Sequence, residues 1–322
     1  MNSSSATNNS TIRNPSQKEI REHRRGMKSA CMKCGGGESE NLKKCSHCGG
    51  RYCSRECQVA DWPNHKGVCL GAVSSTTFVD VNKLCQTFAA NDFLKRHLEV
   101  LIALELKLLD KKKKDLDELF MVQVFVSFEP TDALDLFRLM TKNGHDDRAM
   151  QGMLQICMIN SGWSITEKFG GSTDPTQENN RAVLRGLGLG YPRGTLEFIH
   201  CAGGRFTILH NVFLIAEDAM EQARNAKEIE IPVTFTGRTH KKPVSVLNYM
   251  EYINALIRQD IENRWLLRKN MERRDKKTIR DAFQLGDDED AYGFGAMMKQ
   301  KVESEIIFKE AVNLYSEGMG RT

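Results

Sequence analysis

Seven of the ten cysteines lie between Cys31 and Cys69, and with one histidine they form four closely spaced pairs. The pairs are Cys31–Cys34, Cys45–Cys48, Cys53–Cys57 and His65–Cys69. Thiolate sulfur and imidazole nitrogen are the ligands that zinc prefers in proteins. Eight such ligands saturate two tetrahedral sites and leave no open position for a catalytic water. The pattern therefore predicts two structural zinc ions.

The residues around these ligands carry a family resemblance. The string from Arg51 to Cys69, RYCSRECQVADWPNHKGVC, follows two C-x2-C pairs and resembles the second half of a MYND zinc finger. The resemblance covers residues 31–69, about an eighth of the chain. The HIT-type finger lacks the features seen here at Gln58 and Asp61-Trp62. The spacing alone leaves the partition of the ligands open. The resemblance implies a cross-brace, in which one ion is held by Cys31, Cys34, Cys53 and Cys57 and the other by Cys45, Cys48, His65 and Cys69.

MYND fingers are interaction modules that bind short proline-containing peptides, so the resemblance implies protein or peptide partners. The positions that match the family's peptide groove are Ser46, Gln58 and Trp62. Trp62 could instead fill the small core of the finger together with Ala60 and Val68, and the two roles are compatible. We also expect Ser54 to cap the helix that contains Cys57.

Charge and hydropathy limit the other classes of partner. The formal net charge is only +4, and seven thiolates with two zinc ions would bring it to about +1. A nearly neutral chain is a poor binder of phosphate, so we do not expect nucleic acid as a partner. No window holds the roughly 18 apolar residues of a membrane helix, and residues 1–28 show no apolar stretch of signal-peptide length. We expect an intracellular protein, in the cytoplasm or the nucleus.

An enzyme of unknown reaction in residues 72–285, to which the finger recruits substrate, is the alternative function. The sequence of this region does not indicate any catalytic residue. A glycine-rich segment at 186–192 lacks the strand, the helix and the Lys-Ser/Thr of a phosphate loop. Cys157, His200, Cys201 and His210 have irregular spacing and apolar neighbours, which favours buried structural roles. A SET-type methyltransferase is not expected, because the single Asn-His pair, Asn64-His65, lies inside the finger.

The proposed ligands lie in one of four segments into which we expect the chain to divide. We expect a disordered, Ser/Asn-rich and then basic tail at 1–28, the finger at 29–71, an α+β domain at 72–285, and an acidic linker with a C-terminal helix or tail at 286–322. In the α+β domain we expect a helix at 92–110 capped by Asn91, helices at 211–226 and 245–277, and strands at 120–128 and 153–159. An alternating run at 228–236 predicts an edge strand. The fold class is therefore α+β, with a mixed or antiparallel sheet after the small cross-brace finger.

Overall fold

The computed structural model describes residues 13–27, 31, 33–34, 41–46, 50–71, 75–112, 119–140, 148–161, 191–202, 205–284 and 293–319. Within these ranges only the backbone is described for residues 64, 67–71, 75–80, 201–202, 205–208, 210 and 314–319. None of the helices in this part of the chain combines the length and hydropathy needed to cross a bilayer.

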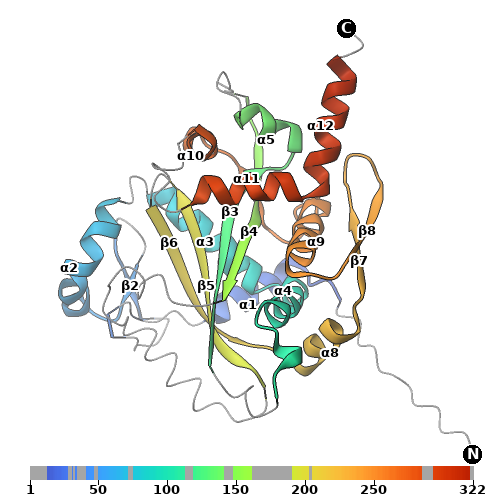
Figure 1. Cartoon of the computed structure of the whole chain (residues 1–322). Helices are drawn as coiled ribbons and strands as arrows, with labels where there is room; N and C mark the ends of the chain where they lie inside the picture. The colour runs from blue at the N-terminus through green and yellow to red at the C-terminus, as the bar shows by residue number, and fades with distance from the viewer. Residues whose placement is uncertain are drawn as a thin grey trace, which may run out of the picture.

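A five-stranded mixed sheet forms the centre of the larger domain (Figure 1), in the order β6-β5-β3-β4-β9. Its strands are β3 (Phe120–Pro130), β4 (Gln151–Ser161), β5 (Arg193–Ala202), β6 (Arg205–Leu214) and β9 (Arg268–Asn270). β3 runs antiparallel to β4 and parallel to β5. The expected α+β class with a mixed sheet is confirmed, and the strands predicted at 120–128 and 153–159 lie within β3 and β4.

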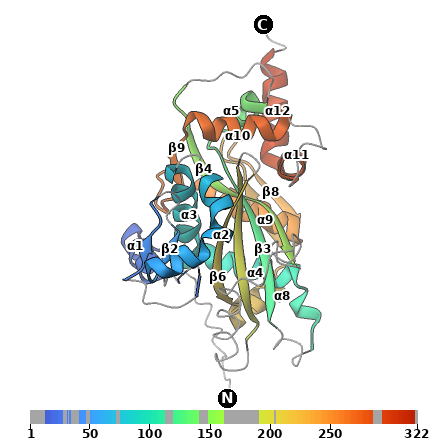
Figure 2. The same cartoon turned by 90° about the vertical axis from the view of Figure 1, so that its left-hand side faces the viewer.

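The two faces of this sheet differ in chemistry because alternate side chains of a strand point to opposite sides. One face is apolar and packs on helix α3 (Ser75–Ala89), with Phe88 edge-on to Phe198 at 5.7 Å. Helices α4 (Asp92–Glu105) and α9 (Val246–Gln259) contact β4. The other face buries polar side chains and is crossed by α11 (Phe294–Ser304). Figure 2 shows α3 and α11 on opposite sides of the sheet.

A buried ionic network attaches the C-terminal helices to the polar face. The ammonium of Lys301 lies 2.6 Å from both carboxylate oxygens of Glu129. One turn later, Glu305 accepts hydrogen bonds from Asn254 at 2.7 Å and from Arg258 at 2.6 Å. Each charge is compensated within hydrogen-bond distance, which is what allows these groups to be buried.

Residues 17–26 differ from the expected disordered tail. They form α1 (Gln17–Gly26), which starts with a capping box between Ser16 and Glu19 and packs against α3. Ile20 is completely buried and belongs to the main core. One apolar anchor and a good cap order a segment whose composition is otherwise polar.

The C-terminal residues also differ from the expected linker and tail. Helices α11 and α12 (Ile306–Met319) bury Phe294, Met298 and Phe308 in the same core cluster as the sheet. The packed domain therefore continues beyond residue 285, at least to Ala311, which is also part of that core.

Two predicted helices are only partly correct. The helix predicted at 245–277 is divided into α9 and α10 (Arg273–Gln284), because the Asp260 carboxylate accepts the backbone N–H groups of Arg264 and Trp265 at 2.8 and 2.7 Å and turns the chain. The helix predicted at 211–226 is confined to α8 (Glu217–Asn225). Residues 211–214 instead extend β6, where pairing with β5 overrides local helix propensity.

Two other local expectations agree with the structure in part. Asn91 caps α4 by accepting the backbone N–H groups of Phe93 and Leu94 at 3.1 and 3.2 Å, although α4 ends at Glu105 rather than 110. The alternating run at 228–236 becomes β7 (Glu228–Pro232), which pairs with β8 (Thr239–Pro243) in a separate two-stranded sheet. Phe235, near the end of the predicted run, lies outside β7 and is 42% exposed beside the turn at Gly237.

Candidate metal centre

The cysteine ligands are positioned by a short hairpin and a helix. Strands β1 (Lys43–Lys44) and β2 (Arg51–Tyr52) form the hairpin, and α2 (Arg55–Gly71) follows directly. Cys53 lies between β2 and α2, and Cys57 lies in the first turn of α2. The Ser54 hydroxyl accepts the backbone N–H of Cys57 at 3.2 Å, as expected of a capping residue.

Four thiols converge at this point. The sulfur atoms of Cys31, Cys34, Cys53 and Cys57 all lie within 4.8 Å of one another. The Sγ atoms of Cys53 and Cys57 are 3.3 Å apart, and those of Cys34 and Cys53 are 3.6 Å apart. A tetrahedral zinc with bonds of about 2.3 Å places its sulfur ligands about 3.8 Å from one another. The donor set and its spacing therefore fit one zinc ion.

The protonation of the cluster is uneven. Burial opposes ionisation of Cys31, but backbone N–H groups of Cys53, Cys34 and Lys33 favour the thiolate and lower its pKa to about 6. Hydrogen bonds with Cys57, Cys34 and Cys31 raise the pKa of Cys53 to about 12. One thiolate is thus stabilised beside Cys53, which keeps its proton, and a metal ion would displace that proton on binding.

Of the second ligand set, the structure places two members. Cys45 and His65 are both buried, and the imidazole of His65 lies edge-on to the Tyr52 ring at 5.7 Å. Cys48 and the side chain of Cys69 lie outside the described residues. The second site therefore has no measured geometry.

The small core of the finger is not the one expected. It consists of Cys31, Leu42, Cys45 and Tyr52, whereas Ala60 is exposed and the side chain of Val68 lies outside the described residues. The phenol of Tyr52 donates a buried hydrogen bond to Asp61 at 2.8 Å. Sequence reasoning did not identify this contact, because a tyrosine and an aspartate nine residues apart carry no spacing signal.

The residues matched to the peptide groove are accessible. Ser46 is exposed, Gln58 is half-buried and Trp62 is 39% exposed. Val59, which was not singled out, is 62% exposed beside them on α2. The ring centroids of Trp62 and His65 are 6.1 Å apart, so the indole packs beside the imidazole while part of it stays exposed.

The grouping of Cys157 with His200 does not occur. His200 pairs in register with Val126 and its Nδ1 lies 3.1 Å from the carbonyl of that residue. Cys157 contacts Glu129 at 4.0 Å, and Glu129 points to the opposite face of the sheet from Val126. Burial lowers the pKa of His200 and raises that of Cys157, as for core residues. The side chains of Cys201 and His210, and residues 186–190, lie outside the described residues.

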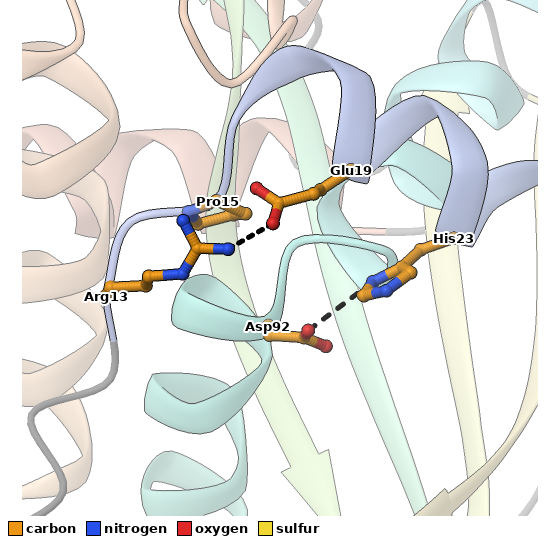
Figure 3. Close-up of a pocket in the computed structure, with 5 residues that line it drawn as sticks. All are labelled: Arg13, Pro15, Glu19, His23 and Asp92. Atoms are coloured by element: carbon orange, nitrogen blue, oxygen red, sulfur yellow. Dashed lines mark hydrogen bonds and ion pairs between the residues drawn. The ribbon is translucent and has the colours of Figure 1, made fainter.

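A pocket at the start of α1 is lined by Arg13, Pro15, Glu19, His23 and Asp92. Figure 3 shows its charged side chains pointing toward one another: Arg13 pairs with Glu19, and His23 lies 3.4 Å from Asp92. The contact between His23 and Asp92 attaches α1 to α4, and the carboxylate of Glu19 is already paired with Arg13.

Comparison with known proteins matches two parts of the chain. A family model described as "MYND finger" matches residues 31–69. A model described as "Domain of unknown function (DUF8205)" matches residues 76–308. No curated protein and no solved structure matches the chain significantly.

Proposed function

Because the chain belongs to the DUF8205 family and carries a MYND finger ahead of that domain, we propose that it is an adaptor or scaffold protein. Its finger binds short proline-containing peptides of partner proteins, through Ser46, Gln58 and Trp62. Two structural zinc ions hold the finger, one on each of the two ligand sets. Free thiolate ligands persist in a reducing compartment, which supports an intracellular location, in the cytoplasm or the nucleus.

The exposure of Trp62 is the observation that carries this proposal. A tryptophan that only filled a mini-core would be buried, but Trp62 is 39% exposed and adjoins Val59, which is 62% exposed. Large apolar side chains exposed together mark interaction surfaces. Gln58 lies one turn before Trp62 on the same helix and offers an amide to a peptide backbone.

The metal gives this surface its rigidity. Cys57 and His65 lie on α2 on either side of Gln58, Val59 and Trp62, so ions bound at both ends fix the helix that presents them. A surface fixed before binding loses less conformational entropy when a peptide docks. The role of zinc is therefore structural, in keeping with ligand sets that have no open position.

Affinity capture with full-length protein tests the proposal. Wild type is compared with Gln58→Ala, Trp62→Ala and the control Phe235→Ala, which removes an aromatic residue of similar exposure on the β7–β8 turn. We expect both finger variants to lose the same partners while zinc content and the control are unchanged. Retention of those partners by the finger variants would assign binding to the larger domain.

Zinc stoichiometry tests the two-ion assignment separately. Native mass spectrometry of the full chain should show two zinc ions, and Cys34→Ala and His65→Ala should each bind fewer. Cys85→Ala is the matched control, because Cys85 is a core thiol of the larger domain. A wild-type content of one ion would contradict the assignment.

A further inference from the structure

The exposed side of α2 carries a regular stripe of four side chains. Arg55, Val59, Trp62 and Lys66 follow one another at intervals of four, three and four residues, which aligns them along one side of an α-helix. All four are exposed. The stripe thus has two apolar side chains in its middle and one cation at each end.

Neither cation is neutralised by a salt bridge within the part of the chain described. The helix itself offers none, because the positions three and four residues away from Arg55 and Lys66 on α2 hold Gln58, Val59, Trp62, Pro63, Cys69 and Leu70. Other helices do supply such partners: on α10, Lys277 pairs with Asp281 four residues later at 2.6 Å.

The two acids of α2 do not cancel these charges. Asp61 is buried and accepts the hydrogen bond of Tyr52. Glu56 is adjacent to Arg55 in sequence, so it projects about 100° around the helix from the stripe.

We propose that this stripe selects peptides whose apolar, proline-containing segment has an acidic residue at each end. The inference rests on the proposed function and specifies its partner class. The rise of the helix places Arg55 and Lys66 about 16 Å apart, a distance that an extended peptide covers in about five residues. The acids should therefore be about five positions apart, with the apolar residues between them over Val59 and Trp62.

A peptide fits the stripe better than nucleic acid does. Phosphates recur along a nucleic-acid strand and are best met by an unbroken row of cations. Here the middle of the row is Val59 and Trp62, which would face phosphate without compensating charge. The charge of the stripe is thus complementary to two separated carboxylates.

The test uses zinc-loaded full-length protein and three matched sets of labelled hexapeptides in fluorescence anisotropy. Each set has the same central residues, such as Pro-Leu-Pro-Val, between two terminal aspartates, two asparagines or two lysines. We expect wild type to prefer the aspartate set by several-fold, up to about tenfold for two exposed ion pairs. The preference should nearly vanish at 1 M salt, where the screening length is about 3 Å.

Charge reversal sharpens the result. The double variant Arg55→Glu/Lys66→Glu should prefer the lysine set, whereas Arg25→Glu, which reverses an exposed cation on α1, should behave as wild type. Equal wild-type affinity for the aspartate and asparagine sets, or displacement of the peptides by an oligonucleotide at equal concentration, would overturn the inference. If the asparagine set binds equally well and Trp62→Ala abolishes that binding, the finger binds peptides as proposed but without selecting acidic ends. If no set binds the zinc-loaded protein, the peptide-binding function and the preference for acidic ends are both wrong.

Discussion

The phenol of Tyr52 donates a hydrogen bond of 2.8 Å to the carboxylate of Asp61, and both residues are buried. This contact joins β2, which leads into Cys53, to the middle of α2, which bears Trp62. It connects the metal-binding hairpin to the proposed peptide surface without using a metal ligand.

Substitution Tyr52→Phe should therefore weaken the finger. It leaves the Asp61 carboxylate buried without this donor, a change that costs about 1–3 kcal/mol. Because folding and zinc binding of such a module are linked, the loss should appear as weaker zinc retention in a competition titration with a chelator. The thermal midpoint of the larger domain should not change.

The double variant Tyr52→Phe/Asp61→Leu provides the control for this prediction. Removing both polar groups costs less than leaving one unsatisfied, so the double variant should retain zinc better than Tyr52→Phe alone. Equal losses in the single and double variants would show that the hydrogen bond does not stabilise the finger.

Removal of zinc should unfold the finger and leave the sheet intact. Among the residues that the structure describes, the finger core contains only Leu42, Tyr52 and cysteines, too little apolar surface to fold a module of this size without metal. Within the described part of the chain, the core of the larger domain includes none of the proposed ligands. Hydrogen exchange after chelation should therefore accelerate at residues 51–69 but not in β3 or β5, and restoring zinc should reverse the change. Loss of protection in both regions together would contradict this independence.

The buried ion pair between Lys301 and Glu129 predicts a large effect on the stability of the larger domain. Lys301→Met should cost about 3–5 kcal/mol, because it leaves the Glu129 carboxylate buried without its ammonium partner. The midpoint of urea unfolding measures the loss. The variant Glu129→Met/Lys301→Met removes both charges and should recover much of it. A double variant no more stable than Lys301→Met would indicate that packing, rather than the unpaired charge, sets the cost.

The finger could be recognised from sequence because its chemistry is local. Ligand pairs three or four residues apart must share one turn, so their types and spacing suffice to predict a zinc site. The Ser54 cap is predictable for the same reason: a hydroxyl three residues before Cys57 meets its backbone N–H. The cap of α4 by Asn91 is predictable in the same way, because its partners, Phe93 and Leu94, are two and three residues away.

Where the observed elements differ from those predicted, most of the differences depend on contacts between residues distant in sequence. Ile20 orders α1 only because α3 offers an apolar surface to it, and the polar composition around it gives no sign of that surface. Residues 211–214 join β6 because Arg193 to Leu196 pair with them. The predicted helix at 245–277 ends early because the carboxylate of Asp260 competes for backbone N–H groups.

A buried histidine gives the larger domain a specific dependence on pH. His97 is buried on α4, with its Nδ1 3.0 Å from the hydroxyl of Tyr249. Burial, and to a smaller extent the charge of Arg96, lower the pKa of His97 to about 4. An unfolded histidine has a pKa of about 6.5, so between these two values the unfolded chain binds a proton that the folded chain does not.

Stability should therefore fall as pH decreases from about 6.5 toward 4, by about 1.4 kcal/mol per pH unit from this residue. Between pH 7.5 and pH 5 the contribution of His97 amounts to about 2 kcal/mol. His97→Gln keeps a hydrogen-bonding group beside Tyr249 but cannot take up the proton, so its free energy of unfolding should depend less on pH by that amount. Urea titrations of both proteins at the two pH values measure the difference. Identical pH dependence would mean that the imidazole is protonated equally in the folded and unfolded states, against its buried position beside Tyr249.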